Sequence, residues 1–214
     1  MLSDLQCCDL LQAQYDNVAG TFDFTETIGA GPVTYALKFY PDCSVVAFEG
    51  SHNLPDWVSN FQARMIFLRD LGGVENGFYT GLPETYLRVV PKLQQDKPIY
   101  CIGHSRGAAH ANIFAAMLIN NGFQVNTVTF GLPRPGDLDL IKILQRQPNT
   151  WYRNYHNFTD QDFVCDVPFP TIDWHYVHPG NPKMIDVPAA PDDSWLILSR
   201  HHLFLYRKGL CELQ

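Results

Sequence analysis

A five-residue motif, Gly103-His-Ser-Arg-Gly107, constrains the fold of this chain more than any other feature. It follows a short apolar run, residues 97–103, that is typical of a buried parallel strand, and it opens a strongly helical segment, residues 106–120. A serine in such a tight strand-to-helix turn is lifted clear of the sheet, and the first amides of the new helix point toward it. The motif therefore predicts an accessible hydroxyl at Ser105.

Strand and helix patterns alternate around this motif. The strands are expected over residues 33–40, 44–48, 97–103, 124–130 and 151–158. The helices are expected over residues 3–15, 79–95, 106–120, 138–147 and 199–213. The turn residues Pro41-Asp42 predict a hairpin between the first two strands. Alternation through the middle of the chain indicates an α/β fold with a mostly parallel sheet flanked by helices, and we expect one domain over residues 1–214.

Composition excludes several classes of protein. Hydrophobic residues make up 46% of the chain and charged residues 17%, which is the balance of a globular protein. A formal net charge of −7 disfavours a nucleic-acid partner. No apolar run approaches the ~20 residues that span a bilayer. The N-terminus lacks the basic and apolar regions of a secretion signal, so we expect a cytoplasmic protein or one released without a signal peptide.

The six cysteines form no C-x-x-C pair. Zinc and thioredoxin-like sites therefore have no support, and no secretion signal directs the chain to an oxidising compartment. We expect free and mostly buried thiols.

A serine nucleophile needs a base and an acid that orients the base. In the α/β-hydrolase arrangement the order along the chain is serine, acid, histidine, so both partners should follow Ser105. Three aspartates compete for the acid: Asp160, Asp162 and Asp166. The histidines that follow the serine are His110, His156, His175, His178, His201 and His202. The last two lie near the C-terminus, where this order places the base.

Further blocks surround the serine motif: residues 45–51 (VVAFEGS), 74–78 (VENGF), 103–109 (GHSRGAA), 128–137 (VTFGLPRPGD), 152–168 (with YRNYH, then DFVCDVP) and 176–178 (YVH). Together they resemble the class 3 lipase family, the fungal-type triacylglycerol lipases and their bacterial and viral relatives. The blocks run in family order from about residue 44 to 206 and cover most of the chain. The resemblance implies an α/β-hydrolase fold with a short lid segment.

The same resemblance implies roles for the acid and the base. Asp162 occupies the position of the family's catalytic acid, six residues before Pro168, and His178 matches a non-catalytic position. For the base, His201 fits an H-x-L-x-x-Y form and His202 fits an H-L form. We slightly prefer His201 and keep His202 as the alternative.

The resemblance also implies the oxyanion hole and the lid. The two donors should be the backbone N–H groups of Ser51 and Arg106. The lid would lie in the segment after Ser51, whose apolar side chains recur at helical spacing. These lid candidates are Leu54, Trp57, Val58 and Phe61.

What the resemblance implies about activity is a lipase or esterase that cleaves acylglycerols or other lipid esters through an acyl-enzyme. The substrate would be met at a lipid–water interface, with no metal, organic cofactor or obligate protein partner. Glu49, Glu75, Arg106 and Ala108 depart from the family pattern and leave the substrate open. The alternatives are a phospholipase A1 and a catalytically silent lipase-fold interaction module, with a serine peptidase ranked lower.

Overall fold

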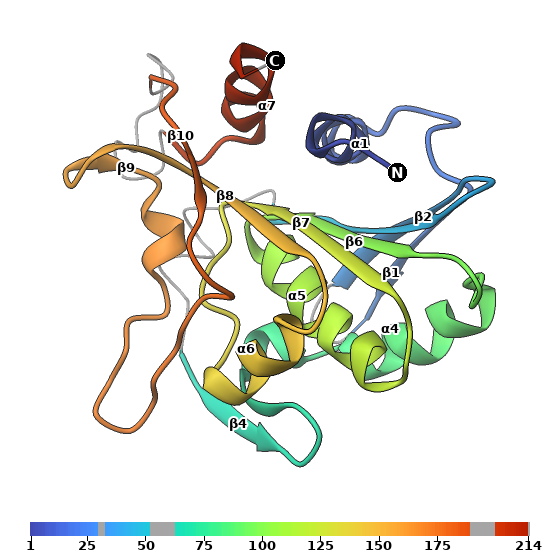
Figure 1. Ribbon diagram of the computed structural model, residues 1–214, viewed down its shortest axis with the longest axis horizontal. Helices are drawn as coiled ribbons and strands as arrows, with labels where there is room; N and C mark the ends of the chain where they lie inside the picture. The colour runs from blue at the N-terminus through green and yellow to red at the C-terminus, as the bar shows by residue number, and fades with distance from the viewer. Residues whose placement is uncertain (30–32, 52–62, 189–199, 214) are drawn as a thin grey trace.

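The computed structural model describes residues 1–29, 33–51, 63–188 and 200–213 (Figure 1). Within these ranges the centre is an eight-stranded sheet in the order β1-β2-β3-β6-β7-β8-β10, with β9 paired only to β8. The strands are β1 (Phe24–Ile28), β2 (Val33–Phe39), β3 (Ser44–Phe48), β6 (Ile99–His104), β7 (Val125–Phe130), β8 (Asn149–Asn157), β9 (Asp160–Gln161) and β10 (Lys183–Ile185). Neighbouring strands from β3 through β10 are parallel, while β1, β2 and β3 pair antiparallel. The expected mostly parallel sheet is confirmed.

Helices cover both faces of this sheet (Figure 1). On one face α1 (Asp4–Tyr15) and α7 (Leu203–Glu212) pack against each other, and on the other α5 (Arg106–Asn120) packs against β6 and β7. Beyond α5 lie α3 (Asn76–Tyr79), α4 (Leu82–Val89) and α6 (Leu138–Leu144). A separate hairpin, β4 (Met65–Leu68) and β5 (Gly72–Glu75), completes this layer.

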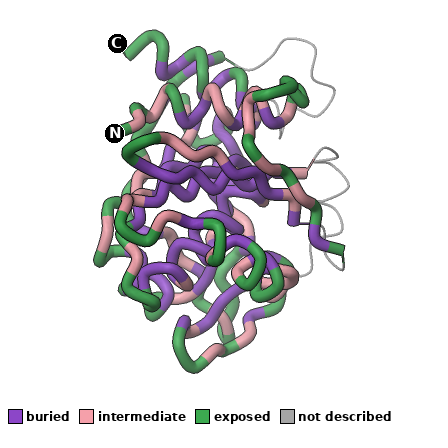
Figure 2. Tube along the Cα trace, turned by 90° about the vertical axis from the view of Figure 1, so that its right-hand side faces the viewer, coloured by how far each residue is buried: buried purple, intermediate pink, exposed green. Residues whose placement is uncertain are grey.

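Burial on both faces explains the continuous apolar run of residues 45–48 in β3. In β3, Val46 and Phe48 belong to the hydrophobic cluster beneath α5, whereas Val45 and Ala47 belong to the cluster beneath α1 and α7. Figure 2 shows this buried layer through the middle of the molecule. Since each face has its own apolar cover, this part of β3 has no polar side and shows no alternation.

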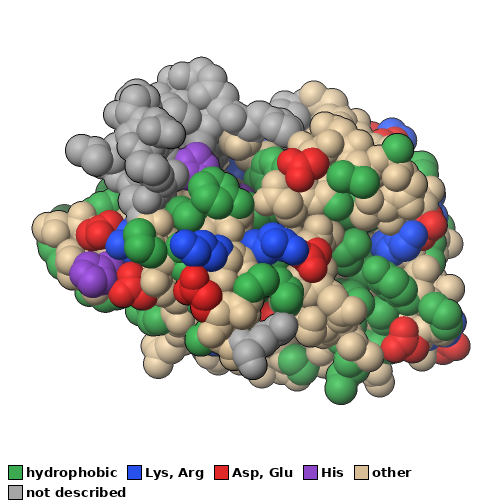
Figure 3. Space-filling view, turned by 90° about the horizontal axis from the view of Figure 1, so that it is seen from above, with side chains coloured by type: hydrophobic (Ala, Val, Ile, Leu, Met, Phe, Trp, Pro, Cys, Tyr) green, Lys and Arg blue, Asp and Glu red, His purple; other side chains and the backbone are tan. Residues whose placement is uncertain are grey.

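Local sequence signals set α1 in place. Ser3 and Gln6 form a reciprocal capping box at its N-terminus, in which each side chain accepts the other residue's backbone N–H. Arg207 of α7 bonds Asp9 of α1 at 2.6 Å, which links the two helices. On the face seen from above, basic and acidic side chains are intermixed rather than gathered by sign (Figure 3).

Three helix predictions are wrong in their bounds. The helix expected over residues 138–147 ends at Leu144. The single helix expected over residues 79–95 is broken at Gly81, whose φ of +90° is left-handed, and α4 begins directly after it with Pro83 in its first turn. The last helix begins at Leu203 rather than at residue 199, because His202 has the extended backbone of a cap. The helix predicted over residues 106–120 is confirmed as α5.

The region after residue 158, where no strand was expected, contains β9, the 3₁₀ turn η2 (Phe163–Asp166) and β10. All six cysteines are free, as expected, and only Cys211 is exposed. No helix in the described part of the chain has the length and apolar character needed to cross a membrane.

Candidate active site

Ser105 occupies a one-residue turn between β6 and α5. Its φ and ψ are +58° and −133°, a left-handed conformation that costs a non-glycine residue on the order of 1–3 kcal/mol. The two flanking glycines allow the crossing. A Cβ on Gly103 would lie 2.2 Å from the Gly107 carbonyl oxygen, and one on Gly107 would lie 2.2 Å from the Phe48 carbonyl oxygen. The turn therefore has the strand–turn–helix geometry of a nucleophile elbow, as the motif predicts.

Asp162 and His201 form a buried pair. The Nδ1 atom of His201 lies 2.7 Å from Oδ2 of Asp162, and both side chains are at most 1% exposed. Asp162 comes from the turn between β9 and η2, and its Oδ1 accepts the backbone N–H of Val164 at 2.9 Å. His201 lies two residues before α7 begins. Residues that are 39 positions apart thus meet just beyond the carboxyl end of β7 and beside Asn154 of β8.

The surroundings of Asp162 keep its carboxyl group charged. Burial raises its pKa, but His201 and the hydroxyl of Tyr206, which donates to Oδ2, outweigh burial, so the pKa lies below its ordinary value. An ionised carboxylate accepts the Nδ1–H of His201 and leaves Nε2 as the acceptor. That tautomer is the one a general base requires.

The serine and the histidine are brought together around the end of β7. The Ser105 N–H donates to the carbonyl of Phe130 at 3.1 Å. A Cβ on the next residue, Gly131, would lie 2.6 Å from Cε1 of His201. The accessible hydroxyl expected at Ser105 is not observed, because Ser105 Oγ is buried. His201 Nε2 is buried as well, and neither atom has a hydrogen-bond partner among the described residues. Catalytic hydrogen bonds often tighten only when substrate binds, so this arrangement suits a resting site.

A chain of hydrogen bonds links Gly50, Tyr15, His104 and His201 next to the serine. The Gly50 N–H donates to the Tyr15 hydroxyl at 3.1 Å, and that hydroxyl lies 3.0 Å from Nδ1 of His104. The Nε2 atom of His104 lies 2.7 Å from the carbonyl oxygen of His201, and the two rings stack at 4.6 Å. Burial and the neighbouring His201 lower the pKa of His104 to about 3. A neutral ring then accepts from Tyr15 at Nδ1 and donates at Nε2.

The segment after β3 runs alongside the elbow. A Cβ on Gly50 would lie 3.0 Å from Cβ of Ser105, so Gly50 borders the serine, and Ser51 is the next residue along the chain. The Oγ of Ser51 is buried without a hydrogen-bond partner among the described residues. Arg106 is the first residue of α5, and the N–H groups of a helix's first turn have no acceptor within the helix. The two residues expected to supply the oxyanion donors thus directly follow Gly50 and Ser105 along the chain.

The competing aspartates have other partners. Asp160 pairs with Arg200, and Asp166 pairs with Arg153 at 2.6 Å and with Arg134 at 3.5 Å. Of the three candidates for the acid, only Asp162 contacts a histidine near the serine.

The competing histidines also lie away from the acid. His110 is buried within α5, and burial lowers its pKa to about 3. His156 is half exposed and bonds Asp186, while His178 stacks on the ring of Trp151.

His202 and His175 complete the set. The His202 ring stacks on the ring of Phe204, with the two centroids 5.5 Å apart. Both residues lie at the start of α7, directly after His201. His175 is exposed on the loop before Tyr176. The lid candidates Leu54, Trp57, Val58 and Phe61 lie outside the described residues.

Two departures from the family pattern have structural roles. Glu75 is buried and caps α3, where Oε2 accepts the Phe78 N–H at 2.8 Å, and burial raises its pKa. Burial lowers the pKa of Arg106, while Tyr15 and Glu49 act in the opposite direction. The charge of Arg106 is thus partly balanced by Glu49.

Within the described residues no group of three His, Cys, Asp or Glu side chains is placed to hold a metal ion.

Tyr15, His104 and Tyr206 were not among the predicted site residues. The histidine of the serine motif and the tyrosine five residues after His201 were both visible in the sequence. Their partners are 35 or more residues away along the chain, so spacing alone does not indicate the contacts.

Comparisons with known proteins identify a family with a similar sequence and structures with a similar fold. A family model described as lipase (class 3) matches residues 45–172. A curated relative, the secreted mono- and diacylglycerol lipase 1 of Fusarium solani, is 30% identical over 120 residues, which are 52% of this chain. That alignment spans only 36% of the relative's length.

Solved structures share the fold. The triacylglyceride lipase of Rhizomucor miehei superposes with a TM-score of 0.68 at 16% identity, covering 85% of this chain and 79% of the lipase. The mono- and diacylglycerol lipase of Aspergillus oryzae gives a TM-score of 0.62 at 21% identity, covering 87% of this chain and 71% of the other. At these identities the likeness shows the fold alone.

Proposed function

Since the chain belongs to the class 3 lipase family, we propose that it hydrolyses the carboxylic esters of acylglycerols or other lipids with Ser105 as nucleophile, His201 as base and Asp162 as acid. The observation that carries the proposal is the buried 2.7 Å contact between Asp162 and His201 beside a strained serine elbow. His202 is not proposed as the base, because the ring that contacts Asp162 is that of His201.

Acylation begins with proton transfer. Nε2 of His201 takes the proton of Ser105 Oγ as that oxygen attacks the ester carbonyl carbon. The carbonyl oxygen becomes an oxyanion, which the backbone N–H groups of Ser51 and Arg106 stabilise. Asp162 stabilises the imidazolium that forms.

The collapse of this intermediate breaks the bond to the alcohol. His201 returns its proton to the departing alcohol oxygen, and the acyl group stays on Ser105. Water then attacks the acyl-enzyme, gives its proton to His201, and the free acid leaves as the serine proton is restored. Asp162 stays ionised throughout. Every proton transfer in this cycle uses these side chains and water.

For the substrate we propose mono- and diacylglycerols met at a lipid–water interface. One line of support is the name of the Fusarium relative. Another is a set of exposed apolar side chains on the connections before and after Asp162 in the sequence, namely Phe158, Phe169 and Ile172. A phospholipase A1 is the second candidate, because Arg106 places a cation beside the nucleophile. The partial balance of this charge by Glu49 ranks it below an acylglycerol lipase.

The proposal is tested by hydrolysis of p-nitrophenyl esters from acetate to palmitate, followed by mono- and diacylglycerol emulsions and phosphatidylcholine vesicles. The control is Ser105→Ala, which removes only the hydroxyl. We expect the wild type to turn over esters and the variant to fall to background. Hydrolysis of phosphatidylcholine in preference to acylglycerol would favour the phospholipase. No hydrolysis of any of these substrates would favour the silent interaction module.

A further inference from the structure

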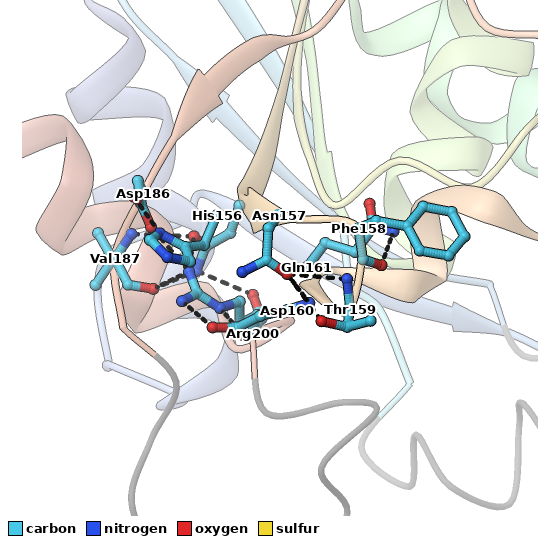
Figure 4. Close-up of polar contacts among 10 residues, drawn as sticks. His156, Asn157, Phe158, Thr159, Asp160, Gln161, Asp186, Val187 and Arg200 are labelled. Carbon is cyan, nitrogen blue, oxygen red and sulfur yellow. Dashed lines mark hydrogen bonds and ion pairs between the residues drawn. The ribbon is translucent and has the colours of Figure 1, made fainter.

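Arg200, the residue immediately before His201, is buried. Only 4% of it is exposed, although arginine is almost never fully buried unless it is paired. Figure 4 shows its guanidinium between Asp160 and Asp186, next to the carbonyl of Val187. No step of the proposed reaction uses this side chain.

The guanidinium bonds to three separate parts of the chain. Nη2 donates to Oδ2 of Asp160 at 2.6 Å, and Nε donates to the other oxygen of the same carboxylate. Nη1 donates to Oδ1 of Asp186 at 3.1 Å and to the Val187 carbonyl at 2.9 Å. Nη1 also lies 3.3 Å from Oδ1 of Asn154 in β8. The side chain of Arg200 thus bonds to β8, to β9 and to the stretch after β10.

Asn154 connects this arrangement to the catalytic acid. Its carbonyl accepts the backbone N–H of Asp162 at 2.8 Å. Its side-chain amide donates to the carbonyls of Arg200 at 3.3 Å and Val187 at 3.1 Å. A single buried residue of β8 therefore contacts the backbone of the acid and the backbone next to the base.

From these contacts we propose that Arg200 is a positioning residue, which fixes the backbone of His201 so that its imidazole meets Asp162 and faces Ser105. The proposal rests on the proposed function of the site. A planar guanidinium suits this role, because its donors have fixed directions and can bond a carboxylate with two parallel hydrogen bonds. A lysine ammonium offers charge without this geometry.

The ion pairs themselves contribute little to stability. Asp160 and Asp186 are 43% and 54% exposed, so water can solvate both carboxylates when the arginine is removed. Loss of the guanidinium therefore leaves no buried, unpaired charge. What is lost is the fixed direction of the chain entering His201. The structure thus predicts an effect on catalysis larger than the effect on folding.

The test compares Arg200→Met with Arg200→Lys and with a matched control, Arg207→Met. Arg207 lies in α7 and bonds Asp9, so the control also removes an arginine from an ion pair near the C-terminus. Steady-state kinetics on a p-nitrophenyl ester and thermal unfolding are measured for each protein. A third readout is the deshielded proton NMR signal of the His201 Nδ1–H bonded to Asp162.

We expect Arg200→Met to lose about 100-fold in kcat with KM unchanged, the loss that a displacement of about 1 Å produces. Arg200→Lys should recover part of kcat, and Arg207→Met should match the wild type. The Nδ1 signal should be lost in Arg200→Met alone. A kcat of Arg200→Met equal to that of Arg207→Met would overturn the proposal, as would an effect on KM only. If Arg200→Met does not fold, Arg200→Lys is compared with Arg207→Met instead, and equal kcat values for these two variants would overturn the proposal.

A failure of the proposed function is distinguishable from a failure of this inference. If the wild type hydrolyses no ester, the proposed function fails, and the Nδ1 signal alone tests Arg200. Loss of that signal in Arg200→Met and its presence in Arg207→Met would still support positioning. Its presence in both variants would overturn it.

Discussion

Gly131→Ala tests the geometry of the acid–base pair from the backbone side. Gly131 follows β7 with a φ of +57°. An added Cβ would lie 2.6 Å from Cε1 and 2.8 Å from Nδ1 of His201, and 2.9 Å from Oδ2 of Asp162. Ordinary contact begins at 3.4 Å, so the imidazole must retreat by about 0.8 Å. Such a retreat changes the distance from His201 to both of its catalytic partners.

A misplacement of about 1 Å costs on the order of 100-fold in rate. We therefore expect the kcat of Gly131→Ala to fall by about this factor, which corresponds to about 2.7 kcal/mol of transition-state stabilisation. The left-handed backbone adds about 1–2 kcal/mol of folding destabilisation for a residue with a Cβ. Stability and catalysis must therefore be measured separately.

Gly122→Ala is the matched control. Its φ of +83° is also left-handed, but an added Cβ would meet no atom within 4 Å. We expect both variants to lose similar stability in thermal unfolding, and only Gly131→Ala to lose kcat in a p-nitrophenyl butyrate assay. Equal kcat values for the two variants would refute the inferred position of the imidazole.

Three further predictions follow from individual side chains. Asp162→Asn should lower kcat by about 10⁴-fold, because an amide cannot hold the required tautomer of His201; steady-state kinetics that show a loss in KM alone would contradict it. His201→Ala should abolish ester hydrolysis while His202→Ala retains it, and the reverse result in the same assay would make His202 the base. Burial lowers the pKa of His104 and His110 to about 3, below the ~6.5 of an unfolded histidine. The unfolded chain then binds more protons than the folded one between these values. The contribution of these two rings to the free energy of unfolding should be constant above pH ~6.5 and fall below it by about 1.4 kcal/mol per pH unit for each ring. Urea unfolding of His110→Phe should show a shallower fall than the wild type, and equal slopes would refute the assignment.

The serine elbow could be predicted because it is a local feature. A buried strand, a tight turn and a helix follow one another within residues 97–120, and α5 has the bounds that its apolar pattern predicts. The signal for the break at Gly81 was also local, since a glycine followed by Leu82-Pro83 is typical of a helix start. The apolar periodicity continues across this break, and it led to a single long helix.

Contacts between distant residues were beyond sequence patterns. His201 and His202 both precede Leu203, and only the course of the chain into α7 shows which ring contacts Asp162. Arg200 looks like a surface residue in the sequence, because its partners Asp160 and Asp186 are separated from it by 40 and 14 positions. The three-residue strand β10 is too short to show alternation, and its pairing with β8 depends on tertiary structure.

The most direct test of the proposed mechanism is covalent labelling with diethyl p-nitrophenyl phosphate, followed by mass spectrometry of the digested protein. The serine oxygen would displace p-nitrophenolate and carry the diethyl phosphoryl group. We predict a single adduct on Ser105, much slower labelling in His201→Ala and no adduct in Ser105→Ala. An adduct on another residue, or labelling at the same rate without His201, would contradict a serine nucleophile activated by this histidine.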